Sequence, residues 1–128
     1  MQFEAVTATI LSACFEVSNE LGIGFLESVY EKALLIALRE KGLVAESQAP
    51  LTVKFRGKNI GEFFADIIVE GRVLLELKAV KSIAPEHAAQ ILNYLKATGI
   101  DVGLLINFGC SKLEYRRFNN YFELVSAD

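Results

Sequence analysis

The sequence has few of the side chains that build soft-metal sites and disulfide frameworks: two cysteines and one histidine among 128 residues. Cys14 falls in an apolar helical stretch and Cys110 in a loop, so the pair has neither a metal-ligand spacing nor a disulfide pattern. This excludes a zinc site built on cysteine or histidine. Two thiols without a framework also predict a reducing, cytoplasmic location.

Long apolar runs and an excess of positive charge are missing too. No run approaches the roughly 20 apolar residues that a membrane helix requires, and no basic-then-apolar signal begins the chain, so we expect a soluble protein without a membrane partner. Thirteen Lys and Arg face sixteen Asp and Glu, a net charge of −3, which argues against non-specific coating of nucleic acid. No glycine-rich phosphate loop is present. The length and a 52% hydrophobic composition predict one domain, residues 1–128.

Two apolar segments, residues 61–69 and 73–79, carry three chemically costly residues: Asp66, Glu76 and Lys78. β-Branched and aromatic residues predict two strands, and Gly71 between them predicts a β-hairpin. A three-residue loop centred on Gly71 would place Asp66 opposite Glu76, with Lys78 on the same face. A two-residue loop would send the two carboxylates to opposite faces.

Two carboxylates that leave water must be paired, neutralised or bound to a metal, and Lys78 alone cannot balance both. A solvated sheet face with a weak salt bridge is the ordinary alternative. The residues that flank Asp66 and Glu76 are apolar at both odd and even positions, so both faces of each strand are apolar. This predicts strands covered on both sides and favours a site. Asp66 and Glu76, joined by the carbonyl of Leu77, would hold Mg²⁺ or Mn²⁺, because these ions prefer oxygen ligands.

The remaining elements follow from hydrophobic periodicity and from glycine and proline positions. We expect helices over residues 3–21, 25–41 and 86–98, extended segments over 43–48 and 50–56 separated by Pro50, a turn at 56–59, a buried and parallel strand over 101–108, and a last strand or two in 113–118 and 121–125. This order predicts an α/β fold with a central mixed sheet, the first two helices on one face and the third on the other.

Two helices carry further candidates. Glu27 and Tyr30 share one face of the second helix, although a carboxylate in a first turn also complements the helix dipole. Gln90 and Tyr94 share one side of the third helix, where Gln90 is equally compatible with a polar surface position; His87, alone, is more simply a satisfied or exposed imidazole. The basic residues that could contact phosphates are Lys54, Arg56, Lys58, Arg116 and Arg117, of which the first three also suit an edge strand that avoids aggregation.

The spacing Asp66, nine residues, Glu76-Leu77-Lys78 resembles the D…E-x-K core of the PD-(D/E)XK nuclease superfamily. Residues 24–30 (GFLESVY) resemble the signature of the GxxExxY protein family, a branch of that superfamily, and residues 85–95 and 103–108 resemble its later blocks. The resemblance covers about residues 5–118. The chain departs from the pattern at Ser18, where many members have His, and at Ile23, where they have Pro.

The resemblance implies a restriction-endonuclease-like core and metal-dependent hydrolysis of nucleic-acid phosphodiesters. Lys78 would then orient the attacking water, Glu27 would add to the metal site, Gln90 would orient substrate, and Tyr30 and Tyr94 would support the site. The alternative hypothesis is a catalytically inactive module of the same fold that binds another protein. Homodimerisation is compatible with both hypotheses, and the sequence does not decide it.

Overall fold

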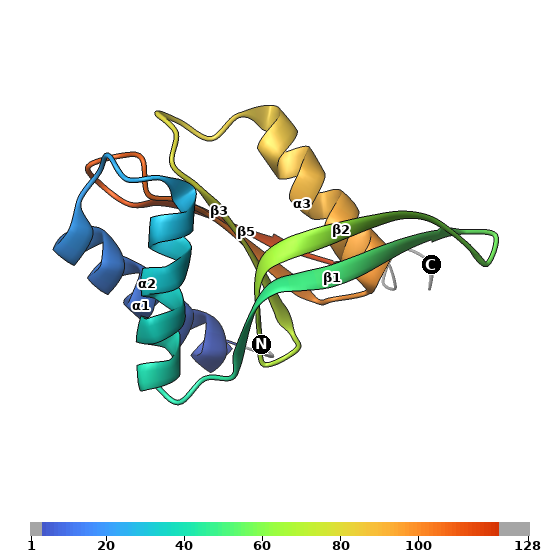
Figure 1. Ribbon diagram of the computed structural model, residues 1–128, viewed down its shortest axis with the longest axis horizontal. Helices are drawn as coiled ribbons and strands as arrows, with labels where there is room; N and C mark the ends of the chain where they lie inside the picture. The colour runs from blue at the N-terminus through green and yellow to red at the C-terminus, as the bar shows by residue number, and fades with distance from the viewer. Residues whose placement is uncertain (1–3, 121–128) are drawn as a thin grey trace.

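The computed structural model describes residues 4–120, which form helices on both faces of one sheet (Figure 1). The helices are α1 (Glu4–Leu21), α2 (Glu27–Glu40) and α3 (Pro85–Thr98), and the strands are β1 (Ala45–Phe55), β2 (Lys58–Val69), β3 (Val73–Lys78), β4 (Val102–Asn107) and β5 (Glu114–Asn119). This architecture confirms the predicted α/β fold. The strand predicted for 121–125 lies outside the described residues.

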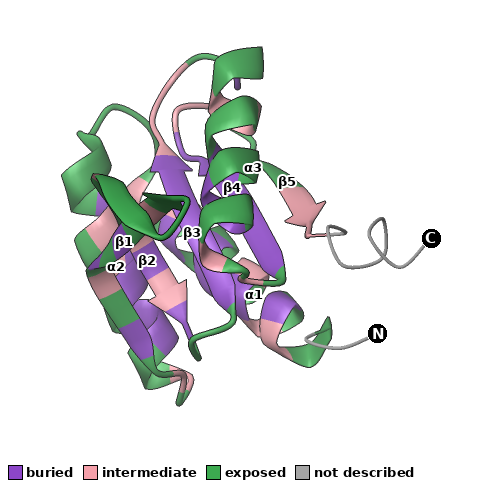
Figure 2. Cartoon of the chain, turned by 90° about the vertical axis from the view of Figure 1, so that its right-hand side faces the viewer, coloured by how far each residue is buried: buried purple, intermediate pink, exposed green. Residues whose placement is uncertain are grey.

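The sheet has the order β1-β2-β3-β4-β5, and among its described strands only β3 and β4 run parallel. Figure 1 shows α1 and α2 on one face of the sheet and α3 on the other. The two central strands are buried almost throughout, as the purple ribbons in Figure 2 show. Their continuous apolar sequences are what a strand covered on both faces requires.

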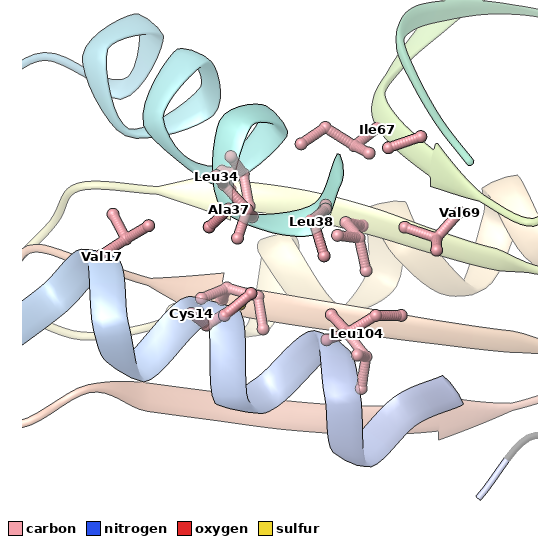
Figure 3. Close-up of a cluster of buried hydrophobic side chains, with 14 of the residues drawn as sticks. Cys14, Val17, Leu34, Ala37, Leu38, Ile67, Val69 and Leu104 are labelled. Atoms are coloured by element: carbon pink, nitrogen blue, oxygen red, sulfur yellow. The ribbon is translucent and has the colours of Figure 1, made fainter. Parts of the chain in front are cut away.

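Each face of the sheet has its own hydrophobic core. The larger core joins α1 and α2 to the sheet through side chains such as Cys14, Leu34 and Leu104 (Figure 3). The smaller core joins α3 to the sheet through side chains such as Leu74 and Ile91. No helix within residues 4–120 is long and apolar enough to cross a membrane.

Several predicted boundaries are wrong; β2, for example, begins at Lys58, inside the predicted turn 56–59. Pro50 does not separate two extended segments, because β1 continues through it and pairs Pro50 with Phe64. β1 is an edge strand, and one side of an edge strand has no ladder partner, so proline is tolerated there. The second helix begins at Glu27, two residues later than expected, after an extended Leu26.

The hairpin between β2 and β3 has the three-residue loop Glu70-Gly71-Arg72, with Val69 opposite Val73. Gly71 has φ +67°, the left-handed conformation that glycine adopts without steric cost. Of the two loops that the sequence allowed, this is the one that aligns Asp66 with Glu76. The predicted register is therefore confirmed.

Candidate active site

The sheet is interrupted at Asp66, on both sides of β2. The ladder between β2 and β3 stops at Ile67–Leu75, and the ladder between β1 and β2 passes from Ser47–Ile67 to Ala49–Ala65 without a pair between them. Asp66 thus has no ladder partner on either neighbouring strand.

The inward-pointing side chains of β1 and β2 also pass from one hydrophobic core to the other at this point. Ala65 and Ile67 are two residues apart and in a regular strand would share a face, yet Ala65 belongs to the α3 core and Ile67 to the α1–α2 core. The same exchange occurs in β1 between Ala45 and Ala49, across Gln48, which has φ +50°. Asp66 therefore lies where the β1–β2 pair turns from one layer to the other.

The carboxylates of Asp66 and Glu76 replace the missing ladder bonds. The Asp66 N–H donates to Glu76 Oε2 at 3.0 Å, and the Leu77 N–H donates to Asp66 Oδ2 at 2.7 Å. Each carboxylate is held by the backbone beside the other, which fixes both side chains in the gap between β2 and β3. Neither of these two bonds occupies Asp66 Oδ1 or Glu76 Oε1.

Burial raises the pKa of Glu76 to about 7, with the nearby Asp66 carboxylate as the second cause; Glu76 is only 6% exposed. Burial is also the main cause that raises the pKa of Asp66, opposed by the Leu77 hydrogen bond. Lys78 lowers both pKa values, but less than burial raises them. The pair is short of positive charge, as the sequence predicted.

Glu27 reaches the same region from α2. Its Oε2 accepts a long hydrogen bond from the Ala79 N–H at 3.4 Å, and its charge acts on the pKa of both Asp66 and Glu76. Tyr30, in the next turn of α2, is fully buried. Its hydroxyl donates to the Gly22 carbonyl at 2.7 Å and accepts from the Phe25 N–H, so it ties down the corner that precedes Glu27.

Tyr94 approaches the carboxylates from α3. Burial raises the pKa of its phenol, and the charge of Glu76 is the second cause. Gln90 donates to the Tyr94 hydroxyl at 3.0 Å, so it reaches the carboxylates only through Tyr94. His87 accepts from the Ala84 N–H at 3.0 Å and caps the start of α3, the ordinary role expected for it.

Residues 4–118 match the model of the PD-(D/E)XK nuclease superfamily. The chain belongs to this superfamily. A comparison with curated proteins finds no match.

Solved structures that resemble this superfamily member agree with it in fold. One is the crystal structure of SSO0001, with a TM-score of 0.58 and 18% identity, covering 73% of this chain and 50% of that one. Another is an alkaline exonuclease (LHK-Exo) from Laribacter hongkongensis, with a TM-score of 0.51 and 14% identity, covering 73% and 55%. The same exonuclease in complex with dAMP has a TM-score of 0.50. This chain therefore aligns with about half the length of each.

Two residues beside the site, Gln48 and Glu31, were not predicted from the sequence. Gln48 lies across the ladder break from Asp66, and its side chain, a hydrogen-bond partner of Asp66, donates to Glu31 Oε1 at 2.9 Å. Burial and then the charge of Asp66 raise the pKa of Glu31. Glu31 is four residues after Glu27 and so shares its helix face, a signal that could have identified it, whereas no local pattern marks Gln48.

The basic residues that were predicted to contact phosphates lie in separate parts of the molecule. Lys54, Arg56 and Lys58 lie at the exposed far end of the β1–β2 hairpin, and Lys58 is about 26 Å along β2 from Asp66. Arg117 pairs with Glu4 at 3.1 Å. Arg116 is exposed and aligns through Leu105 with Glu76, so it lies in the same cross-strand row as the carboxylates. Of the predicted cations in β5, Arg116 is the better placed.

The chemistry of the carboxylate pair fits a hard cation, because it offers oxygen atoms, excess negative charge and burial that a cation would offset. Within residues 4–120, however, no three Asp, Glu, His or Cys side chains are arranged as a ready metal cage. Asp66 and Glu76 would therefore supply only two ligands, a number compatible with Mg²⁺, which keeps several waters.

Proposed function

We propose that this chain is a divalent-metal-dependent nuclease that hydrolyses phosphodiester bonds of nucleic acid. The observation that carries the proposal is the ladder break, where Asp66 and Glu76 converge beside Lys78. The chain also belongs to a nuclease superfamily. Residues 24–30 further favour the GxxExxY branch of that superfamily.

Asp66 and Glu76, with the Leu77 carbonyl, would hold Mg²⁺ or Mn²⁺, and Glu27 would bind a metal-bound water or a second ion. When bound, the ion would polarise the phosphate as a Lewis acid and acidify a water molecule. Support for this ligand set comes from the raised pKa values of the two carboxylates, since a bound cation offsets the repulsion and burial that raise them. The backbone hydrogen bonds hold the two side chains in place before substrate arrives.

Lys78 is the next β3 residue after Glu76 on the same face of the strand. Its ammonium would orient the attacking water and stabilise the charge that develops on the phosphate oxygens during in-line displacement. The Tyr94 hydroxyl accepts from Gln90 and keeps its own hydrogen, so it can donate to a phosphate oxygen. Arg116, in the row of Glu76, would contact a neighbouring phosphate.

The test is cleavage of single-stranded and duplex DNA and RNA with Mg²⁺, Mn²⁺ or EDTA. Lys78→Ala should reduce the rate about 10²- to 10³-fold, since removing one charge-stabilising donor typically has this effect. Lys81→Ala is the matched control, because Lys81 is an exposed lysine three residues further on, outside the site. Cleavage that survives both EDTA and Lys78→Ala would belong to another site or a contaminant.

Metal binding is tested separately by calorimetry with Mn²⁺ and Mg²⁺. Wild type and Lys78→Ala should bind the ion, and Asp66→Ala should not, because it removes one of the two proposed carboxylate ligands. Equal binding by wild type and Asp66→Ala would place the metal elsewhere.

The second candidate is a catalytically inactive module that binds a protein partner or a second copy of itself. The observation in its favour is a group of exposed apolar side chains on the β1–β2 hairpin, away from the carboxylates: Phe55, Ile60 and Phe64. Absence of cleavage of all four substrates, together with a dimer in light scattering, would favour this candidate.

A further inference from the structure

A cleft of about 620 Å³ separates α3 from the outer part of the β1–β2 hairpin, residues 50–64, which we call the arm. The arm extends beyond the body of the molecule beside α3 (Figure 1), and much of it is exposed (Figure 2). Val53 and Phe63 line the cleft from the arm, and Gln90, Asn93, Tyr94 and Lys96 line it from α3. The volume lies in the range of sites for small organic groups.

The cleft and the candidate active site share Tyr94. Tyr94 lines the cleft and is near enough to Glu76 for that carboxylate to affect the pKa of its phenol. Gln90 also lines the cleft and holds the Tyr94 hydroxyl at 3.0 Å. A phosphate at the carboxylates would therefore have its neighbouring nucleotide at the mouth of this cleft.

The walls of the cleft suit a flat heteroaromatic group. Phe63 is 41% exposed, and its ring centroid lies 5.5 Å from that of Tyr94 at 44°. Gln90 and Asn93 add amide groups that can both donate and accept hydrogen bonds at a base edge.

The charge of the walls argues against a duplex as the occupant. The described lining contains one cation, Lys96, and one carboxylate, Glu86, so it lacks the positive charge that tracks phosphate backbones. A paired base is stacked on its neighbours and cannot offer its face to Phe63, whereas an unpaired base can. We propose that this cleft binds an unpaired nucleotide next to the scissile phosphate, with its base stacked on Phe63; this inference rests on the proposed nuclease function.

The experiment measures binding of short fluorescein-labelled oligonucleotides by anisotropy in EDTA, where metal-dependent cleavage does not occur. Single-stranded DNA and RNA and the corresponding duplexes are compared. Phe63→Ala should weaken single-strand binding about tenfold, because stacking of one base on an aromatic ring is lost. Phe63→Trp should keep it, since an aromatic face remains.

Phe64→Ala is the matched control, because Phe64 is the next residue of β2, is 57% exposed and lies outside the cleft lining. It should leave binding within about twofold of wild type. Equal losses in Phe63→Ala and Phe64→Ala, or duplex binding that depends on Phe63 as strongly as single-strand binding, would overturn the proposal.

Cleavage assays separate this inference from the proposed function. If single strands bind in a way that depends on Phe63 but are not cleaved, the nucleotide-binding proposal is supported and the nuclease proposal is wrong. If Phe63→Ala cleaves single strands with an unchanged KM, the nucleotide-binding proposal is wrong and the nuclease proposal is retained. A rise in KM with little change in kcat is the expected result, because the base contact is present before and during the reaction.

Discussion

At Glu76, a carboxylate is surrounded by apolar strands and by a second carboxylate, with one ammonium nearby. Its folded-state pKa of about 7 lies above its ordinary value of 4.5. The folded chain therefore holds this proton more tightly than the unfolded chain does, and ionisation of Glu76 opposes folding. Such a group destabilises the metal-free protein at neutral pH and favours a cation that can relieve it.

We expect the metal-free protein to lose stability as pH rises from about 4.5 to about 7, and to change little from this group above that range. The loss should reach roughly 3 kcal/mol at most. Urea unfolding in EDTA at about pH 5 and about pH 7.5 measures it. Glu76→Gln, which does not titrate, should flatten the dependence, and an equal slope in both proteins would assign it to other groups.

Asp66→Asn should raise the melting temperature of the metal-free protein at neutral pH by a few degrees. The substitution removes the charge that repels Glu76, while the amide oxygen can still accept the Leu77 N–H. Differential scanning fluorimetry in EDTA measures the effect. Glu62→Gln, an exposed carboxylate in the same strand, is the control and should change nothing. A lower melting temperature for Asp66→Asn would show that the charged form stabilises the fold.

Among the elements, the connection from β3 to α3 depends on one buried polar residue. Asn107 is fully buried at the end of β4, where its Oδ1 accepts from the Val80 N–H at 3.0 Å and its Nδ2 donates to the Val80 carbonyl at 2.9 Å. It also accepts from the Gly109 N–H at 2.9 Å. These bonds hold the segment after Lys78 against the sheet, beside the Ala79 N–H that Glu27 accepts from.

Gly109→Ala should destabilise the fold by about 2–4 kcal/mol. A Cβ at this position would overlap the Val80 carbonyl oxygen and meet further backbone atoms of Ala79 and Val80, so no flexible side chain can move to make room. Gly61→Ala is the control, since its Cβ would meet only the Phe63 ring at 3.4 Å. Chemical denaturation of both variants provides the comparison. Equal stability of Gly109→Ala and wild type would mean that this segment shifts freely.

At the scale of the whole molecule, the candidate site is assembled from the helical layers on both faces and from the sheet between them. Glu27 comes from the α1–α2 face, Tyr94 from the α3 face, and the carboxylate pair from the break in the sheet between them. A cation that binds the folded arrangement and not the unfolded chain should therefore stabilise the entire fold.

We predict that Mg²⁺ or Mn²⁺ at about 100 times its Kd raises the stability of the wild type by about 2.7 kcal/mol, seen as a melting temperature higher by several degrees. Asp66→Ala should show no such increase, because a ligand is missing. Thermal unfolding with and without the ion measures the difference. The same increase in wild type and Asp66→Ala would exclude the carboxylate pair as the metal site.

The order of elements and the register of the central hairpin were determined by the sequence alone. Gly71 fixes the loop through its left-handed backbone, and strand alternation then carries Asp66 to Glu76 and Lys78 over only a few residues. Such local geometry depends on neighbours along the chain, which the sequence displays directly. The roles of Asp66, Glu76, Lys78, Glu27 and Gln90 in catalysis stay predictions.

Only the tertiary structure decided which residues from distant elements surround that pair. Pro50 is tolerated because β1 lies at the sheet edge, and Gln48 meets Asp66 because β1 and β2 change faces together. Glu27 and Ala79 are 52 residues apart and meet through the packing of α2 on the sheet. Periodicity states which face of an element is buried, but not which element will cover it, because that choice depends on the summed packing of the whole chain.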